Sequence, residues 1–356
     1  MTENTLSPFE GPACPLPLPH TRQVVIGHGS GGRMTHDLIR RVFQAHFSSP
    51  ALLAGNDFAR VALSSEPGQL AISTDAHIVT PLFFPGGDIG RLAICGTVND
   101  VAMSGATPLY LTASFILEEG LAMEQLERVA RSMQAAAEEA GVQIVAGDTK
   151  VVEKGKADGL FISTTGVGWL PDGLTIGGEC AQPGDVVLVS GTLGDHGIAV
   201  LAARGELGFE TGVESDVAPL NHMIANLLRA APHTHVLRDP TRGGLATTLN
   251  EIAAQSGVSI LLEEKDIPLN PAVQATCEML GFDPLYVANE GKLIVILPPE
   301  EAEAALAAMR AHPAGKMATR IGVVQASPAA RVSIHTLIGA SRLLDMLAGE
   351  MLPRIC

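Results

Sequence analysis

The chain has 356 residues, of which 46% are hydrophobic and 17% charged, a composition typical of a folded protein and not of a disordered one. Acidic residues outnumber basic ones by 38 to 23, and the formal charge of -15 argues against binding to the phosphate backbone of nucleic acids. There is no apolar run of about 18 residues that would span a membrane. Residues 1–11 lack the basic and apolar segments of a secretory signal, so we expect a cytoplasmic protein.

The first half of the chain predicts a mixed domain of strands and helices. Residues 1–21 are rich in proline and predict a flexible arm, with an N-terminal domain over 22–176 behind it. Apolar periodicity and turn residues predict, in chain order, a strand at 23–26, a helix at 34–47, strands at 58–63 and 70–74, a helix at 90–104, a strand at 109–117, a helix at 123–140, and strands at 142–146 and 160–169.

Turn residues at 171–173 and 177–178 indicate a domain boundary, and a new strand follows at 184–190. We expect a second domain over 177–340, in which helices and strands alternate. Residues 341–352 have the spacing of a short helix, within a tail over 341–356 that carries the terminal Cys356. The fold class is therefore α/β or α+β, in two domains.

A glycine cluster follows the first predicted strand. Gly27, Gly29 and Gly32 match the spacing of a dinucleotide-binding loop, but no acidic residue is well placed about 20 residues later. Gly32 is followed by Arg33 and Met34, which excludes a phosphate-binding loop of the Walker type. The cluster is either a flexible loop that enters a helix or a flap whose backbone amides contact phosphate.

Several carboxylates stand where apolar runs end, beside glycine, threonine or asparagine. Each alone is typical of a turn or a helix cap. Together they fit a magnesium–nucleotide site, because magnesium prefers oxygen ligands and is held jointly by a few carboxylates and by phosphates. The candidates are Asp57, Asp75, Asn99, Asp100, Asp148 and Asp239.

Three further residues are candidates for catalysis. Lys150 follows Asp148 by two positions, and Glu290 precedes a predicted strand; the two side chains would form either a proton relay over a bound tail or an ordinary salt bridge between domains. Cys356 is the last residue of the chain, so its thiol either frays with the terminus or swings into a site. Beside a phosphoryl-transfer site, a mobile thiol suggests that the tail is itself a substrate.

Long motifs from residue 22 to the end resemble the HypE family of hydrogenase maturation proteins. The terminal Pro-Arg-Ile-Cys is the most specific of them. The residues that carry the resemblance are 28–32, 81–90, 96–100, 147–152, 190–197, 239–244, 289–292 and 353–356.

The resemblance implies a fold, a reaction and partners. The family is related to aminoimidazole ribonucleotide synthetase and selenophosphate synthetase, two-domain proteins that bind ATP and Mg²⁺ and form homodimers through the sheet of the N-terminal domain. Cys356 would accept a carbamoyl group from the carbamoyltransferase HypF, and ATP would drive its dehydration to a thiocyanate. The HypC–HypD iron scaffold would then receive the cyanide for a [NiFe]-hydrogenase.

The same resemblance assigns roles to the candidate residues. Lys150 and Glu290 would transfer the proton. Asp57, Asp75, Asn99, Asp100, Asp148 and Asp239 would contact the nucleotide, with Asp75, Asp100, Asp148 and Asp239 on the metal.

Three other functions are compatible with parts of the sequence. A small-molecule kinase such as thiamine-monophosphate kinase would not need Cys356, and a scaffold whose tail docks on a partner would not need the aspartates. A dinucleotide-dependent dehydrogenase rests on the glycine spacing alone.

Overall fold

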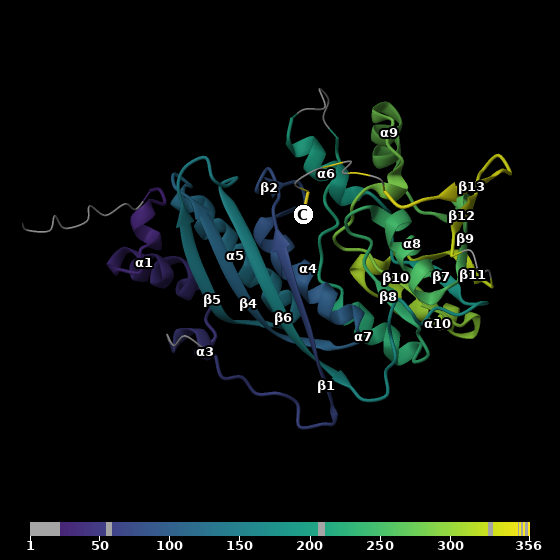
Figure 1. Cartoon of the computed structure of the whole chain (residues 1–356), viewed down its shortest axis with the longest axis horizontal. Coiled ribbons are helices and arrows are strands. Elements are labelled where there is room, and N and C mark those ends of the chain that lie inside the picture. Colours follow the sequence, from purple (N-terminus) through teal and green to yellow (C-terminus); the bar gives the residue numbers. More distant parts are fainter. Residues whose placement is uncertain are drawn as a thin grey trace, which may run out of the picture.

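The computed structural model describes residues 22–54, 59–205, 211–326, 330–347, 349, 352, 355 and 356. The predicted arm over 1–21 and the candidate Asp57 lie outside the described residues. The chain forms two sheets side by side, and the C-terminus lies between them (Figure 1). No described helix is long and apolar enough to cross a membrane.

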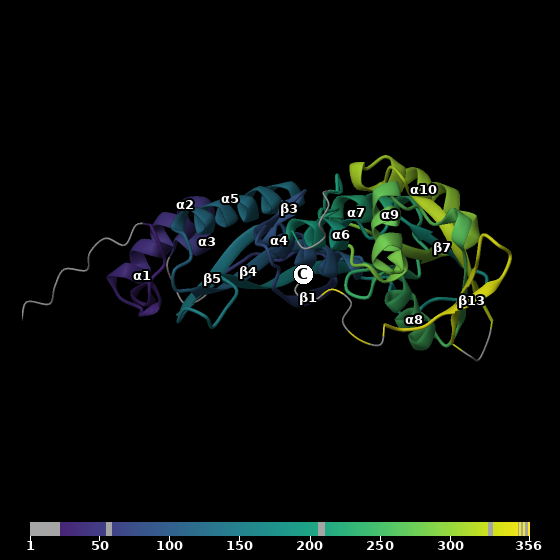
Figure 2. The ribbon, with the colours of Figure 1, turned by 90° about the horizontal axis from the view of Figure 1, so that it is seen from above.

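The first sheet has four strands in the order β1-β6-β4-β5, in which β4 and β5 run parallel and the other neighbours antiparallel. The strands are β1 (Gly68–His77), β4 (Thr107–Glu118), β5 (Gln143–Val152) and β6 (Leu160–Pro171). Helices α4 (Ile89–Met103) and α5 (Met123–Ala140) cover one face (Figure 2). These elements confirm the helices predicted at 90–104 and 123–140 and the strands predicted at 70–74, 109–117, 142–146 and 160–169.

Helix α4 is buried on almost every side, since small residues let it lie close to the sheet. Gly166 and Gly168 on β6 provide the room: a Cβ atom at Gly168 would lie 2.5 Å from a methyl of Val101, and one at Gly166 would lie 2.8 Å from a methyl of Thr97. Asn99 and Asp100 lie in the last two turns of α4, so the close approach of the helix to the sheet sets the positions of their side chains.

The N-terminal elements pack at the β5 edge of the sheet. They are η1 (Ile26–Gly29), α1 (Arg33–Leu38), the π-helix η2 (Ile39–Phe43), α2 (Gln44–His46) and α3 (Pro50–Leu53). Phe43 stacks on Phe115 of β4 with 4.3 Å between ring centroids. The strand predicted at 23–26 is wrong: only Gln23 forms a bridge, to Ala122, before the 3₁₀ turn begins. Residues 59–63 also form no strand, because no neighbouring strand pairs with them.

The second sheet has seven strands in the order β13-β12-β9-β11-β7-β10-β8. They are β7 (Val186–Val189), β8 (Val236–Arg238), β9 (Ser259–Glu263), β10 (Ile294–Leu297), β11 (Thr319–Gln325), β12 (Val332–His335) and β13 (Ser341–Leu344). The helices around it are α6 (Asp195–Ala203), α7 (Asn221–Ala230), α8 (Gly244–Ser256), α9 (Pro271–Leu280) and α10 (Ala302–Arg310). Short elements complete the fold: the hairpin of β2 (Phe83–Phe84) and β3 (Gly87–Asp88), and the 3₁₀ turns η3 (Glu264–Asp266), η4 (Pro284–Tyr286), η5 (Pro299–Glu301) and η6 (Pro313–Gly315).

The helix predicted at 341–352 is wrong. Residues Ser341–Leu344 form β13, the edge strand that pairs with β12. Leu343 is 62% exposed and Leu344 is buried, the alternation of a strand. The spacing of Leu343, Leu344 and Leu347 fits a helix equally well. Residues 341–344 form a strand because they pair with the edge of β12.

The face of the first sheet opposite α4 and α5 carries exposed apolar side chains. Leu70, Ile72 and Ile116 are 48%, 65% and 41% exposed. In the described part of the chain no helix lies over this face (Figure 2). Such a surface is typical of an interaction site.

We predict that Gly168→Ala lowers the thermal midpoint of unfolding, because the added methyl group forces α4 away from β6. Overpacking of this kind costs about 1–3 kcal/mol. Calorimetry on the full chain tests the prediction, with Gly212→Ala as the control, since no atom lies within 4 Å of a Cβ built at Gly212. Equal midpoints for the two variants would contradict the close packing of α4.

Candidate functional site

The C-terminal residues dock against the end of β1. Ile355 forms an antiparallel bridge with Val79, and the backbone N–H of Ile78 donates to a carboxyl oxygen of Cys356 at 3.1 Å. Ile355 is only 4% exposed and packs in the core of the first sheet. The terminal thiol is therefore held in a defined place between the two sheets.

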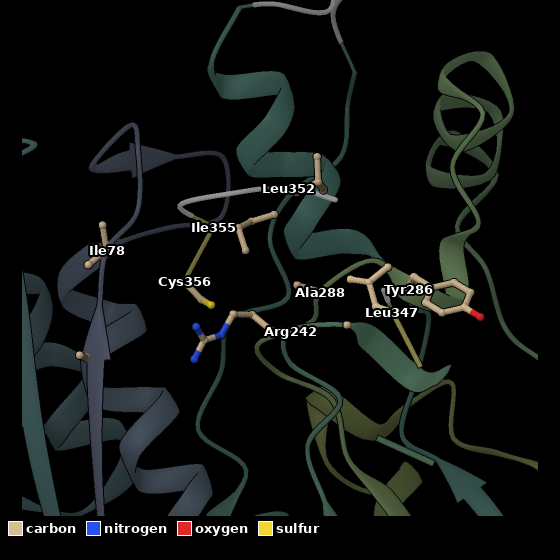
Figure 3. Close-up of a pocket in the computed structure, with 10 residues that line it drawn as sticks. Ile78, Arg242, Tyr286, Ala288, Leu347, Leu352, Ile355 and Cys356 are labelled. Atoms are coloured by element: carbon tan, nitrogen blue, oxygen red, sulfur yellow. The ribbon is translucent and has the colours of Figure 1, made fainter. Parts of the chain in front are cut away.

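A cavity of about 220 Å³ surrounds Cys356. Ile78 lines it from the first half of the chain, and Arg242 and Ala288 line it from the second. The guanidinium of Arg242 lies beside the sulfur of Cys356 (Figure 3). A cationic side chain and the thiol therefore border the same cavity.

A second cavity of about 520 Å³ lies next to the first and is lined by acidic and basic side chains. Asp100 and Ser73 face it from the first half, and Asp239 and Arg238 from the second. Arg242 lines both cavities, so the cavity of the thiol and the cavity of the carboxylates share a cationic side chain.

The carboxylates near this wall repel one another. Burial, reinforced by Asp100, raises the pKa of Asp239 to about 7. Burial also raises the pKa of Glu290 well above its usual range, and Asp239 and Asp216 add to the effect. Burial raises the pKa of Asp100, while a hydrogen bond from Ser73 at 2.8 Å acts in the opposite direction. A cluster with this repulsion would be stabilised by a bound cation.

The carboxylates fit a magnesium ion held together with a nucleotide. Among the described residues, no three His, Cys, Asp or Glu side chains converge to hold a metal ion by themselves. Magnesium in nucleotide sites does not need this, because one or two carboxylates, the phosphates and water share its coordination. Asp100 and Asp239 line the larger cavity and fit that role, and the half-buried Asp75 is close enough for its charge to raise the pKa of both.

Asn99 has a different position from the carboxylates around it. Its Nδ2 donates to the carbonyl oxygens of Ala218 and Glu290 at 3.0 and 3.4 Å, and its Oδ1 accepts from the N–H of Leu220 at 2.8 Å. The side chain is 1% exposed and joins the two halves of the chain. Its contact with nucleotide stays a prediction.

Asp148 and Lys150 lie away from the acidic cluster. They lie on β5, where Asp148 pairs with Ser114 of β4 and Lys150 pairs with Ile116. The side chains of Asp148 and Lys150 are 63% and 65% exposed. Strand β5 is one edge of the sheet and β1 the other, about 14 Å apart at three strand spacings. Within one chain the structure therefore does not bring Lys150 to Glu290 or Asp148 to Asp239.

Lys150 contacts Asp148 instead. Its Nζ donates to both carboxylate oxygens at 3.0 and 2.8 Å, and this hydrogen bond lowers the pKa of Asp148. The glycine cluster lies at the same edge, where a Cβ at Gly29 would approach the backbone N of Val151 to 2.7 Å. The glycine cluster and Lys150 therefore both lie at the β5 edge of the sheet, whereas Cys356 docks at the β1 edge.

Sequence patterns did not single out Arg242, which lines the cavity of the thiol, His196, which contacts Ile355, or Lys292, which approaches Asp195 beside His196. Arg242 was visible in the Asp-Pro-Thr-Arg-Gly-Gly segment, and Lys292 in Asn-Glu-Gly-Lys. His196 was visible in Gly-Asp-His-Gly, but its histidine had no spacing typical of a metal ligand. Arg242 follows the candidate Asp239 by three positions, Lys292 follows the candidate Glu290 by two, and His196 lies within the motif at 190–197.

Comparison with known proteins identifies the family. The N-terminal domain of AIR synthase related proteins matches residues 55–170, and the C-terminal domain of the same proteins matches 182–335. Carbamoyl dehydratase HypE of Cupriavidus necator is 55% identical over 334 residues, which cover 94% of this chain and 95% of the relative. The chain belongs to the HypE family.

Other HypE proteins are also similar over nearly their whole length. Carbamoyl dehydratase HypE of Escherichia coli K12 is 48% identical over 94% of this chain and 99% of its own. A crystal structure of HypE in complex with ATP superposes with a TM-score of 0.89 at 53% identity, covering 93% of this chain and 99% of that one. HypE in a HypE–HypF complex superposes with a TM-score of 0.76 at 50% identity, covering 87% and 99%.

The HypE fold is shared more widely. Thiamine-monophosphate kinase of Stenotrophomonas maltophilia superposes with a TM-score of 0.63 at 24% identity, covering 83% of this chain and 95% of that one, which shows a common fold alone. The expected two-domain fold of the aminoimidazole ribonucleotide synthetase type is thereby confirmed.

The raised pKa of Asp239 predicts a pH-dependent stability. The folded state holds the proton up to about pH 7, whereas the ordinary value is 3.8, so folding binds protons between these values and stability falls as pH rises through them. Asp239→Asn removes this loss and should raise the thermal midpoint of the ligand-free protein at pH 8 by about 2–4 °C.

The gain from Asp239→Asn should disappear towards pH 4, and Mg-ATP should reverse the order by stabilising the wild type more. Differential scanning calorimetry across this pH range measures both effects. Asp172→Asn, at an exposed turn, serves as the control. A gain that stays constant with pH would show that Asp239 is ionised throughout.

Proposed function

We propose that the chain is an ATP-dependent carbamoyl dehydratase that acts on its own C-terminus. It converts an S-carboxamide on Cys356 to an S-cyanide, which supplies cyanide to the iron of a [NiFe]-hydrogenase. The observation that carries the proposal is the docked thiol of Cys356, which shares Arg242 with the carboxylate-lined cavity. The relatives named carbamoyl dehydratase and the relative solved with ATP support it.

The proposed reaction has two steps. The amide oxygen of the S-carboxamide attacks the γ-phosphorus of ATP. ADP leaves and one N–H proton is lost, which gives an O-phosphorylated thiocarbonimidate, S–C(=NH)–O–phosphate. Loss of the remaining N–H proton together with inorganic phosphate then forms the C≡N triple bond. Phosphorylation is needed because the amide oxygen is otherwise a poor leaving group, and the site contributes positioning and charge neutralisation.

Each residue of the site has a part in this scheme. Asp75, Asp100 and Asp239 would hold the magnesium ion, which neutralises the charge on the phosphates of substrate ATP. Arg242 borders both cavities, and we assign it to the phosphoryl group as that group passes towards the tail. Glu290 is buried, and burial raises its pKa well above the usual range, which favours a role in accepting and releasing a proton.

The exposed face of the first sheet supports a homodimer. Leu70, Ile72 and Ile116 lie on it, and β5 presents Asp148 and Lys150 on the same face. If two sheets meet face to face about a two-fold axis, each chain offers its Lys150 and Asp148 to the other. The proton-transfer pair would then be Glu290 of one chain and the lysine of the second copy.

The tail must also reach partner proteins. Residues 345–356 follow the last strand and extend at about 3.3–3.6 Å each, up to ~40 Å in all. A HypE relative has been solved with HypF, which supports carbamoyl transfer from that enzyme. We further propose that the HypC–HypD complex takes the cyanide, in the cytoplasm.

The proposed reaction predicts a defined sequence of masses. After incubation with HypF, carbamoyl phosphate and Mg-ATP, the intact protein should gain a carboxamide and then lose the mass of one water. Both changes should vanish in Cys356→Ala, and the loss of water should require ATP. Intact-mass spectrometry follows the two steps.

If the tail is intact and reduced, HypF is active, and Cys356 still gains no carboxamide, the dehydratase proposal is wrong. ATP consumption that persists in Cys356→Ala with an added small molecule would instead indicate a small-molecule kinase.

The dimer proposal predicts complementation between variants. Lys150→Ala and Glu290→Gln should each lose dehydration. Their mixed dimers contain one site with both native residues, so a re-equilibrated equimolar mixture should regain about a quarter of wild-type activity. The double variant mixed with itself is the control. An inactive mixture, with heterodimers verified by native mass spectrometry, would place both residues in one chain's site.

A further inference from the structure

His196 contacts the docked tail from the second half of the chain. It lies in the first turn of α6 and is fully buried. Its Nε2 is 2.6 Å from the carbonyl oxygen of Ile355, and its Nδ1 is 2.8 Å from the hydroxyl of Ser215. The ring therefore connects the residue before the thiol to the loop at 211–219.

The two contacts fix the tautomer of the imidazole. A carbonyl oxygen only accepts hydrogen bonds, so Nε2 carries the proton and donates it to Ile355. The Ser215 hydroxyl oxygen already accepts from the N–H of Val217 at 3.2 Å, which leaves its own proton to donate to Nδ1. Burial lowers the pKa of His196, which keeps the ring neutral, as this arrangement requires, although Asp216 opposes the effect.

The ring itself is held in place. Phe84 lies edge-on to it, with 5.4 Å between centroids and an interplanar angle of 88°. The residues that neighbour His196 and Ser215 in sequence, Asp195 and Asp216, both approach the Nζ of Lys292, at 3.7 and 3.3 Å. A side chain with this support keeps one rotamer, which is what positioning a mobile segment requires.

The same network reaches the proposed proton acceptor. The backbone N–H of Glu290 donates to Asp216 Oδ1 at 3.1 Å, and Lys292 lies two residues further along the chain. A Cβ atom at Gly291, between them, would lie 1.8 Å from the carbonyl oxygen of Asp216, so this segment packs directly on the loop that carries Ser215. The position of Glu290 and the position of the tail contact are thus set by one group of residues.

We propose that His196, oriented by Ser215, is a positioning residue that holds the C-terminal tail in its docked state with Cys356 in the cavity beside Arg242. The role rests on the proposed function, in which the loaded Cys356 must enter the site. Other contacts of the tail include the backbone N–H of Ile78, the bridge to Val79 and the apolar burial of Ile355. None of these depends on the tautomer of a side chain, so substitutions at His196 and Ser215 separate the His196 contact from them.

The test measures tail docking without catalysis. Cys356 of the full, uncarbamoylated protein is alkylated with iodoacetamide, and cleavage after Glu350 releases the peptide 351–356, whose only cysteine is Cys356. Alkylation of the partly exposed Cys180 gives an internal reference in each sample. Alkylation of Cys95, which is fully buried, reports unfolding.

His196→Phe keeps the ring but removes the donor, and His196→Gln retains an amide N–H close to the position of Nε2. We expect Cys356 alkylation to rise about three- to tenfold in His196→Phe, the effect of one lost hydrogen bond, and to return close to the wild-type rate in His196→Gln. Ser215→Ala removes the hydroxyl that fixes the proton of His196 on Nε2, so part of the population loses the donor to Ile355. The rate of Cys356 alkylation should therefore rise, but less than in His196→Phe.

Unchanged alkylation of Cys356 in both His196→Phe and Ser215→Ala would overturn the proposal. Equal rises in His196→Phe and His196→Gln would also overturn it, because the donor would then be irrelevant. If His196→Phe exposes Cys95, the decision rests on Ser215→Ala and His196→Gln.

Dehydration of the carbamoylated protein is measured in parallel. If the wild type forms no thiocyanate but Cys356 alkylation in the wild type and the variants follows the expected order, the dehydratase proposal fails. The proposed contact between His196 and the tail then still stands. If the wild type is active, His196→Phe should slow dehydration at saturating ATP by the fraction of tail that is undocked, without changing the KM for ATP.

Discussion

The arrangement of the whole site depends on the buried side chain of Asn99. It uses both of its amide hydrogens and its oxygen to join helix α4 to the loops of the second half, including the carbonyl of Glu290. Asp100 is the next residue, so the same contact that joins the halves sets the distance between the carboxylates of each. The glycines on β6 allow α4 to lie close enough for this contact. Replacing a buried amide in such a place leaves several polar groups without partners, which is costly in the interior.

The carboxylates make the ligand-free site electrostatically unfavourable. Burial and mutual repulsion raise the pKa values of Asp100, Asp239 and Glu290 together. A bound cation would remove this repulsion, so the proposed affinity for a metal–nucleotide complex and the electrostatic cost of the ligand-free site would have one cause. Arg242 lines both cavities, and Arg238 also lines the one that holds the carboxylates, so cations border both. In the proposed reaction, Arg242 would bind the phosphoryl group as it passes from the carboxylates towards the thiol.

Local patterns in the sequence were sufficient for the elements of the first sheet and singled out two carboxylates of the larger cavity, Asp100 and Asp239, but not Glu251. Helix 123–140 ends at Gly141, whose positive φ is typical of a helix C-terminus, and alternation identified most strands. Residues 341–344 could not be assigned in this way, because the partner strand β12 decides their conformation. The separation of Lys150 from Glu290 was equally hidden: it depends on strand order and on which face of the sheet each side chain occupies. The contacts of His196 depend on a loop about 20 residues away and on the far end of the chain, which no local pattern encodes.

The tail is attached to the same molecule that it docks on, through residues 345–356 after the edge strand β13. Random-coil statistics for a chain of this length place its end within about 20 Å of the attachment point, which corresponds to an effective concentration on the order of millimolar. Docking therefore needs an intrinsic dissociation constant of only about that size to fill the site. A few weak contacts, one buried isoleucine and two hydrogen bonds, suffice for occupancy at this concentration. The same weakness lets a partner protein compete for the tail, so one tether length balances retention of the thiol against its release.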